Sequence, residues 1–334
     1  MAAVEGPAGG RGVVEMTVTA RRDVSEGVVE LELDASESGG FLDWTPGAHI
    51  ELVLPSGLVR QYSLCGDDLR RNRVRIAVLR ETQGRGGSLE VHRTLAVGTT
   101  VGVRGPRNHF ELVESDEYLF VAGGIGITPI LAMVREVGRA GRRWHLVYGG
   151  RTRRSMAYLD ELEDLARRSG GTGVLTVVPE DELGYPDLCG LLSGASRDTV
   201  LYACGPEGLL SALEALSAEL LESGRLHLER FQGSGQAAHP AADGALDGFE
   251  VEIASTGQVL TVGPDDSLLD VVRAVAPDVP FSCREGWCGA CETVVLAGRP
   301  CHRDEVLNDD ERERSATMMI CVGRSLDPRL VLDL

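Results

Sequence analysis

The chain has 334 residues, enough for two or three domains that each bury a core, and its 51 acidic and 33 basic residues leave a net charge of −18. Such acidity excludes nucleic acid and anionic membrane surfaces as expected partners, and no apolar run is long enough to span a bilayer. Every basic residue is arginine, which excludes the lysine of a Walker-type phosphate loop and lysine Schiff-base chemistry.

The N-terminal residues 1–12 are small, polar and rich in glycine. They lack the apolar core of a signal peptide, so we expect a loose tail. The chain also contains 8 cysteines, and four of them are spaced as metal ligands. This usage does not suggest a disulfide framework and fits a reducing cytoplasm.

Short strands with frequent turns fill residues 13–113. Apolar or alternating runs occur at 14–19, 28–33, 49–54 and 74–79, and turns containing Pro-Gly, Pro-Ser-Gly and Gly-Pro punctuate the region. This pattern predicts a small antiparallel β-barrel.

Two stretches of this predicted barrel are candidates for ligand binding. Residues 60–63, Arg-Gln-Tyr-Ser, place an aromatic ring between a cation and a hydroxyl. Such a stretch could lie against the planar ring of a ligand and hold its phosphate or carbonyl group. An edge-strand tyrosine is the commoner explanation. The glycine run 84–88 ends in a serine at the start of a possible helix, where free amides would face an anion. An ordinary flexible loop is the alternative there.

From about residue 117 the pattern changes to alternating strands and helices. A buried strand at 118–122 runs into Gly-Gly-Ile-Gly-Ile-Thr-Pro at 123–129, and a helix follows. This is the layout of a dinucleotide site at the carboxyl end of a parallel sheet, in a variant of the usual glycine spacing. Further strands are predicted at 145–148, 174–178 and 200–203, and further helices at 158–165 and 207–221. The last strand ends in Cys-Gly-Pro at 204–206, where Cys204 either faces a ligand or fills the core.

A stretch of mixed Gly, Ala and Pro at 232–247 predicts a linker. Strands at 249–253 and 258–262 then form a hairpin signal, and a helix is predicted over 267–275. The segment 248–334 has 16 acidic and 8 basic residues and therefore a net charge of −8.

The most specific motif lies in this last segment and consists of four cysteines. Three of them follow the spacing C-x4-C-x2-C and the fourth comes later, which is the plant-type pattern for a 2Fe–2S cluster. The predicted ligands are Cys283, Cys288, Cys291 and Cys321. Gly286 and Gly289 permit the unusual backbone angles that a loop needs to curl around a cluster. Zinc is the alternative, but zinc sites typically pair two C-x2-C hooks and only one is present.

The order of these motifs is similar to that of a known family. Residues 60–63, 86–88, 123–129, 204–206 and the cysteine pattern together resemble the phthalate dioxygenase reductase family, to which vanillate demethylase reductases belong. The resemblance covers nearly the whole chain after residue 12. It implies an FMN-binding antiparallel β-barrel at 13–113, an NAD-binding α/β domain with a parallel sheet at 114–231, the linker 232–247, and a plant-type ferredoxin domain of β-grasp fold at 248–334.

The resemblance also implies the residues of each site. Along the FMN it places Arg60, Gln61, Tyr62 and Ser63, at the ring edge Ala77, Val78 and Leu79, at the phosphate Gly86, Gly87 and Ser88, and from the nucleotide domain Thr128 and Phe231. In the NAD pocket it places Gly124, Gly126 and Cys204. Ser63 and Cys204 are the candidate catalytic residues.

Several positions depart from the family pattern or lie close to the predicted ligands. Leu79 stands where relatives commonly have lysine, so only a backbone contact is expected there. Arg284 and Trp287 occupy loop positions that are smaller in relatives, which bears on the exposure and potential of the cluster. The 29 residues between Cys291 and Cys321 already match the plant-type pattern, so we interpret Cys301 as a bystander.

The implied activity is an NADH-dependent reductase that passes electrons from NADH through FMN and the 2Fe–2S cluster to a separate terminal oxygenase. A nicotinamide gives up two electrons together, whereas the cluster takes one, so a flavin is needed between them. A non-enzymatic electron carrier and an FAD or NADPH version of the same reductase are the alternatives. A Rieske oxygenase and a haem monooxygenase are both open as acceptors. We expect a cytoplasmic monomer.

The two cofactor choices rest on short segments. The phosphate loop has no evident adenine-binding extension after it, which favours FMN over FAD. Residues 148–154 contain three arginines and no acid, so they would tolerate the 2′-phosphate of NADPH, whereas the resemblance implies NADH.

The negative charge of 248–334 suggests docking to a basic patch on the acceptor. Electron transfer that slows as salt rises would support that hypothesis.

Overall fold

The computed structural model describes residues 13–35, 43–66, 73–82, 86–196, 198–217, 224–231, 245–281, 283–286, 289–304, 306–307 and 309–334. The chain divides into two compact units, Met1–Glu229 and Arg230–Leu334. None of the helices in the described ranges is long and apolar enough to cross a membrane.

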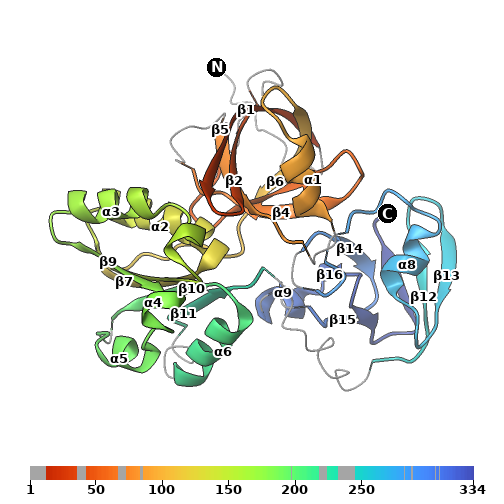
Figure 1. The fold of residues 1–334 in the computed structure, drawn as a ribbon. Coiled ribbons are helices and arrows are strands. Elements are labelled where there is room, and N and C mark those ends of the chain that lie inside the picture. The colour runs from red at the N-terminus through yellow and green to blue at the C-terminus, as the bar shows by residue number, and fades with distance from the viewer. Residues whose placement is uncertain are drawn as a thin grey trace, which may run out of the picture. The chain divides into compact units, whose positions relative to one another are not determined.

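The first unit begins with a six-stranded antiparallel sheet that closes on itself (Figure 1). Its strands are β1 (Val14–Ser25), β2 (Val28–Asp34), β3 (His49–Val53), β4 (Val59–Ser63), β5 (Arg73–Leu79) and β6 (Thr100–Arg107), and helix α1 (Gly87–Thr94) stands between β5 and β6 in the chain. The strand order is β4-β3-β6-β1-β2-β5, and a bridge between Leu64 and Ile76 joins the two edges. The predicted antiparallel barrel is confirmed.

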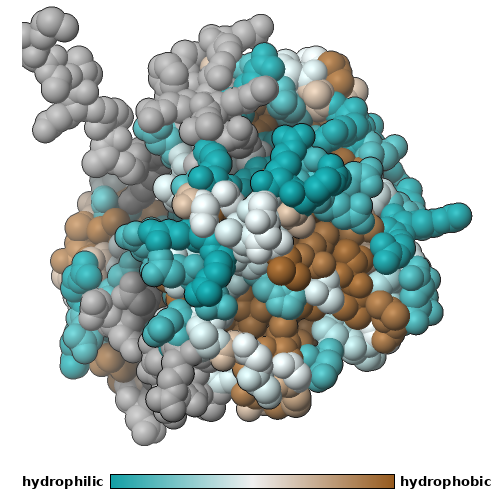
Figure 2. Space-filling view, turned by 90° about the vertical axis from the view of Figure 1, so that its left-hand side faces the viewer, coloured by the Kyte–Doolittle hydropathy of each residue, from teal (hydrophilic) through white to brown (hydrophobic). Residues whose placement is uncertain are grey.

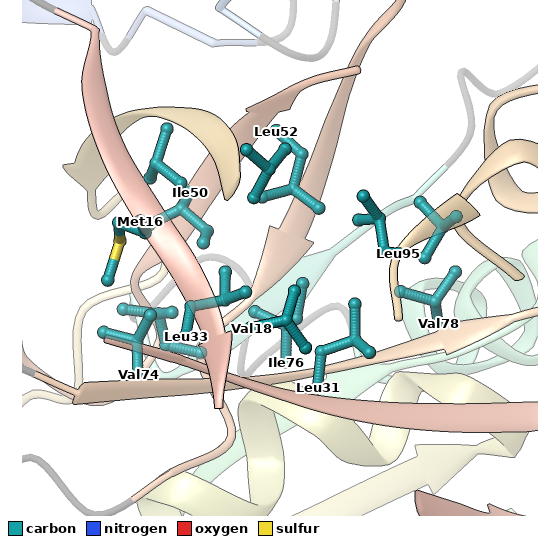
Figure 3. Close-up of a cluster of buried hydrophobic side chains, with 14 of the residues drawn as sticks. Met16, Val18, Leu31, Leu33, Ile50, Leu52, Val74, Ile76, Val78 and Leu95 are labelled. Carbon is teal, nitrogen blue, oxygen red and sulfur yellow. The ribbon is translucent and has the colours of Figure 1, made fainter. Parts of the chain in front are cut away.

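Apolar side chains from alternate strand positions fill this barrel. Figure 3 shows Met16, Val18, Leu31, Leu33, Ile50, Leu52, Val74, Ile76, Val78 and Leu95 turned towards one another, and all of them are buried. Each such side chain contributes about 1.5–3 kcal/mol when it leaves water. Because successive side chains of a strand face opposite sides, the positions between these residues remain available for a ligand.

A five-stranded parallel sheet forms the rest of the first unit. Its strands are β7 (Glu117–Gly123), β8 (Arg143–Gly150), β9 (Gly173–Pro179), β10 (Val200–Cys204) and β11 (Leu226–Glu229). Their order is β11-β10-β7-β8-β9, so the chain reverses its direction of progress across the sheet between β7 and β10. Ligands of open α/β sheets bind at the carboxyl ends of the strands at such a reversal.

Helices cover both faces of this sheet. They are η2 (Gly124–Gly126), α2 (Ile127–Arg139), η3 (Arg153–Ser155), α3 (Leu159–Arg168), α4 (Glu180–Leu183), α5 (Leu188–Ser193) and α6 (Glu207–Leu216). Figure 1 shows α2 and α3 on one face and α5 and α6 on the other. The face shown in Figure 2 carries both hydrophilic and apolar residues, and its largest apolar area lies to the right of the centre. The predicted parallel-sheet domain is confirmed.

Some element ends differ from the prediction. Strand β1 continues to Ser25, although the apolar pattern ended at residue 19, because its polar continuation pairs with β2 as far as the Ser25–Val28 pair. Helix α6 begins at the predicted Glu207 and ends at Leu216, and residues 218–221 of the predicted helix lie outside the described ranges. Pairing across strands decides the first boundary, and a hydrophobic pattern cannot show it.

The second unit is a mixed five-stranded sheet of order β13-β12-β18-β14-β16. Its strands are β12 (Phe249–Ile253), β13 (Gln258–Val262), β14 (Glu292–Ala297), β16 (Thr317–Met319) and β18 (Arg329–Leu332), beside a small sheet of β15 (Pro300–Cys301) and β17 (Arg324–Ser325) and the helices α8 (Leu268–Arg273) and α9 (Asp309–Arg314). Strands β12 and β18 are parallel. Leu269 and Val272 of α8 are buried in the same core as Val251 and Leu330 of the sheet. The cysteine loop lies in the chain between α8 and β14.

Candidate functional site

The Arg-Gln-Tyr-Ser strand and the start of α1 meet on the barrel. Arg60 of β4 lies so close to Gly87 that a Cβ atom added at Gly87 would be 2.5 Å from Arg60 Nε. Gly86, just before the helix, has a φ of 85°, and no side chain caps the helix. A guanidinium and the first amides of α1 are therefore close together, as a phosphate requires. This arrangement fits the predicted FMN phosphate.

The other residues of β4 present a neutral and partly buried surface. Burial raises the pKa of Tyr62, so its ring stays neutral, and this ring packs against the barrel core. Ser63 is buried, and the Gln61 amide donates to Glu51 at 3.4 Å. A neutral aromatic ring offers a planar flavin a flat contact surface.

The structure limits which groups of strand β5 and of Ser88 can contact a flavin. Val78 is a core residue, so its side chain faces the barrel interior, and its carbonyl oxygen lies 2.9 Å from His92 Nε2. Ala77 and Leu79 alternate with it and face the other side. The Ser88 hydroxyl accepts from the Glu81 amide at 3.0 Å, which leaves the Ser88 backbone amide as its natural contact for a phosphate.

The glycine turn at the end of β7 packs directly on the end of β10. A Cβ atom added at Gly126 would lie 2.2 Å from the carbonyl oxygen of Cys204. Gly124 has a φ of 55°, and its carbonyl accepts from the Tyr148 hydroxyl at 3.2 Å. Thr128 is buried, and its hydroxyl donates to Ile125 O at 3.0 Å. The predicted NAD residues Gly124, Gly126 and Cys204 therefore lie together at the reversal point of the sheet.

Glu229 is a site residue that the sequence pattern did not reveal. Its strand β11 pairs with β10 so that Glu229 stands opposite Cys204, and the two side chains approach to 4.0 Å between Cys204 Sγ and Glu229 Oε2. Burial raises the pKa of Glu229 to about 8. The pKa of Cys204 is raised well above its ordinary value, mainly by burial and to a smaller extent by the nearby Glu229. Both groups are therefore neutral at pH 7. The only available signal was a lone acid at the end of a short strand.

We expect the substitution Glu229→Gln to stabilise the first unit at neutral and higher pH. The pKa of this carboxyl is about 8 in the folded protein, whereas an ordinary glutamate has a pKa of 4.5, so the wild type loses stability as pH rises between these values and glutamine loses none. The difference should be on the order of 3 kcal/mol at pH 7. Urea unfolding at pH 5 and pH 8 measures it, with Glu114→Gln as the control because the Glu114 side chain is 89% exposed. Equal stability of variant and wild type at pH 8 would contradict the expectation.

Three of the four predicted cluster ligands come together in the second unit. Cys283 and Cys291 are buried, and both contact the Cys321 thiol; these contacts, with burial, raise the pKa of Cys321. The Glu285 amide donates to Cys283 Sγ at 3.3 Å. No group of three or more His, Cys, Asp or Glu side chains within the described ranges closes around a single ion, and Cys288 lies outside those ranges. Gathered sulfurs with an amide directed at one of them fit a thiolate-bound cluster.

The backbone of this loop adopts the angles that its glycines permit. Gly286 has a φ of 78° and Gly289 one of 72°, as expected. Arg284 also has a positive φ, 64°, and its guanidinium pairs with Asp270 at 3.0 Å and lies 4.7 Å from the Phe281 ring centre. The arginine that departs from the family pattern therefore connects the loop to helix α8.

The structure does not place Trp287, the linker or Phe231 against the site. Trp287 and most of the linker, residues 232–244, lie outside the described residues. Phe231 belongs to the second unit, so its predicted position over the flavin would join the two units and stays a prediction. Cys301 is buried in β15, opposite Arg324 of β17.

Comparison with known proteins matches each part of the chain. Family models match for an oxidoreductase FAD-binding domain at 15–112, an oxidoreductase NAD-binding domain at 120–215 and a 2Fe–2S iron–sulfur cluster binding domain at 251–325. The phenoxybenzoate dioxygenase subunit beta of Ectopseudomonas oleovorans is 41% identical over 93% of this chain and 94% of that protein. A solved structure of phthalate dioxygenase reductase is 31% identical, with a TM-score of 0.69, over 97% of this chain and 98% of that one. The chain belongs to the phthalate dioxygenase reductase family.

A third relative shows the same architecture inside a larger protein. An intact type IV self-sufficient cytochrome P450 monooxygenase is 40% identical, with a TM-score of 0.83, over 96% of this chain but only 41% of that one. The present chain is thus an oxidoreductase with flavin-, NAD- and 2Fe–2S-binding domains, the reductase component of an oxygenase system. It transfers electrons to a separate oxygenase.

Proposed function

We propose that this reductase uses FMN as its flavin, takes electrons from NADH and works as a cytoplasmic monomer. Arg60 beside the first turn of α1 supports a flavin phosphate at this place, and the observation that carries the choice of FMN is the length of the connection after this helix. After α1 ends at Thr94, only residues 95–99 precede β6. This connection is too short to add an adenine-binding segment to the phosphate site, so a mononucleotide fits best.

The proposed chemistry needs binding and orientation more than acid–base groups. A flavin takes both electrons of the nicotinamide as a hydride and passes them on singly, which suits a 2Fe–2S acceptor. Within this scheme Tyr62 supports the flavin ring, and Gly124 and Gly126 let the nucleotide approach the sheet. A protonated Glu229 and an un-ionised Cys204 place no negative charge near the transferred hydride.

Two measurements test the proposed function. NADH added without oxygen should bleach the visible absorbance of the bound flavin, and the flavin released by heat should migrate as FMN on chromatography. FAD as the main species would contradict the choice of FMN. A protein without flavin, or with a flavin that NADH does not bleach, would support the non-enzymatic electron carrier instead.

Acidic residues support the preference for NADH, because the fold brings them close to arginines from which they are distant in the sequence. Helix α4 begins with Glu180, Asp181 and Glu182 directly after β9. Glu182 pairs with Arg153 at 3.4 Å. These carboxylates neutralise an arginine that would otherwise attract a 2′-phosphate, and they would repel that phosphate themselves.

We therefore expect kcat/KM to be higher for NADH than for NADPH, and Glu182→Gln to reduce that preference. Removal of one exposed charge near the expected place of the 2′-phosphate should change the ratio of the two kcat/KM values by roughly 3- to 5-fold, because such ion pairs contribute up to about 1 kcal/mol. Steady-state reduction of ferricyanide with each coenzyme measures the ratio. Glu136→Gln is the control, since Glu136 pairs with Arg139 on α2 at 2.9 Å. A wild-type preference for NADPH would overturn the proposal.

The acceptor is proposed only as a class. One relative is named as part of a dioxygenase and another as a cytochrome P450 monooxygenase. A 2Fe–2S donor gives electrons singly, which both kinds of oxygenase can accept. The identity of the oxygenase and its substrate must come from reconstitution with oxygenases of the host.

A further inference from the structure

A cluster of charged side chains joins the barrel to the nucleotide-binding part of the first unit, away from the glycine turn. We call it the interdomain bridge and define it as Cys65, Arg75, Arg135, Tyr158 and Glu161. Cys65 follows the Arg-Gln-Tyr-Ser strand, and Arg75 stands in β5 two residues before Ala77. Arg135 belongs to α2 and Glu161 to α3. The cluster therefore links both flavin strands to the helix that begins at the glycine turn.

One carbonyl group accepts hydrogen bonds from both sides of this boundary. Arg75 Nη2 donates to Cys65 O at 2.9 Å, and Arg135 Nη1 donates to the same oxygen and to Gly66 O at 2.7 Å. A main-chain oxygen has little freedom to move without its strand. These bonds consequently fix the segment after β4 to the side chain of a residue in α2.

One carboxylate is shared in the same way. Arg135 Nε donates to Glu161 Oε1 at 2.9 Å, and Arg75 Nη2 lies 3.4 Å from Glu161 Oε2. The Arg135 side chain is only 12% exposed and that of Arg75 19%. Both Arg135 Nε and Arg135 Nη2 donate to Glu161 Oε1, and partly buried contacts of this kind hold a more defined geometry than exposed ion pairs.

A buried tyrosine completes the bridge. Tyr158, the residue before α3, has a φ of 64°, and its hydroxyl lies 3.4 Å from Cys65 Sγ. The Arg75 guanidinium lies 5.4 Å from the Tyr158 ring centre. Burial raises the pKa of Cys65 to about 11 and also raises that of Tyr158, so both stay neutral. Among the described residues, the anions that pair with the two arginines are Glu161 and Glu30.

We infer that Arg135 and Glu161 are positioning residues for hydride transfer, because they set the distance between the flavin strand β4 and the glycine turn. The inference rests on the proposed function. Arg135 stands on the helix that follows the turn that would hold the nicotinamide nucleotide, and it donates to the carbonyls that follow the flavin strand. Displacement of reacting atoms by about 1 Å can lower a rate by roughly 100-fold, so a bridge of this kind has kinetic consequences without touching either cofactor.

The test uses Arg135→Met, which keeps much of the length of the side chain and removes its donors, and Glu161→Gln, which removes only the charge. Single-turnover reduction of the flavin by saturating NADH should be slowed by roughly 10- to 100-fold in Arg135→Met and less in Glu161→Gln. Flavin content, flavin midpoint potential and ferricyanide reduction by chemically reduced protein should stay at wild-type values. Arg135→Lys should give an intermediate rate, since one ammonium cannot span both carbonyls and the carboxylate.

A readout independent of turnover is amide hydrogen exchange in the segment 64–66. The Cys65 amide donates to Arg75 O at 2.8 Å within the bridge, and its exchange should accelerate in Arg135→Met. The matched control is Arg167→Met, because Arg167 pairs only with Asp164 of its own helix among the described ion pairs and is 70% exposed. A variant that keeps its flavin and the wild-type limiting rate of reduction would overturn the inference. Failure of wild-type flavin to accept electrons from NADH would instead overturn the proposed function.

Discussion

Replacement of Cys291 by serine should separate the two halves of the reaction. A hydroxyl is a poor ligand for iron compared with a thiolate, so the cluster should be lost or severely weakened. The variant should still bind flavin, oxidise NADH and reduce ferricyanide, because the first unit contains the flavin and nucleotide sites and has its own core. Transfer to the native oxygenase should fall by more than the roughly 10- to 100-fold that loss of an outer-shell partner costs.

Cys301→Ser is the matched control for this experiment. Cys301 is as buried as Cys291, with 2% exposure for each, and both belong to the second unit. If the four-cysteine assignment is right, this variant keeps the absorbance of the cluster and the transfer to the oxygenase. Loss of NADH oxidation in a folded, flavin-loaded Cys291→Ser variant would show that the cluster takes part in the hydride step, and the sequential order would be wrong.

Gly126→Ala should have the largest effect of any single methyl group added to the nucleotide site. Its Cβ would lie 2.2 Å from the Cys204 carbonyl oxygen and 2.5 Å from its carbonyl carbon, and neither backbone atom can turn away as a side chain would. Overpacking of a core costs typically 1–3 kcal/mol, and a clash with backbone should reach or exceed about 3 kcal/mol. Urea unfolding and flavin reduction at saturating NADH should both be impaired.

Gly124→Ala provides the comparison within the same turn. Nothing lies within 4 Å of a Cβ added there, so its cost is that of a positive φ, which is 55°. That conformation costs a non-glycine residue roughly 1–2 kcal/mol. Gly124→Ala should therefore be the milder variant in unfolding experiments. Equal destabilisation by the two alanines would mean that the close packing between the glycine turn and Cys204 has no energetic weight.

The 2Fe–2S-binding domain and the glycine turns could be predicted from the sequence because each depends on residues close together in the chain. A C-x4-C-x2-C loop brings its own thiolates within reach of one cluster, and the positive φ values of Gly286 and Gly289 are the local consequence. The barrel and the parallel sheet were also predicted correctly. Strand alternation and strand–turn–helix order are short-range patterns that follow from burying one face of each element.

The contacts between distant segments were decided only by the tertiary structure. Glu229 stands beside Cys204 because β11 pairs with β10 in one register, and a shift by one residue would turn its side chain to the other face. The raised pKa of Glu229 follows from burial, which no spacing in the sequence displays. In the same way Arg153 looked free to bind a phosphate until the fold placed Glu182 beside it.

The sequence by itself therefore indicated a flavin-binding, an NAD-binding and a 2Fe–2S-binding domain, since ligand type and local turn geometry are encoded within a few residues. The tertiary structure alone decided how the barrel and helix α2 of the first unit are held against one another. Cys65, Arg135 and Glu161 are far apart in the chain, and each has an ordinary explanation when considered separately. Their common hydrogen bonds exist only after the barrel and α2 have packed together, because long-range packing, and not local propensity, fixes which polar groups must share partners.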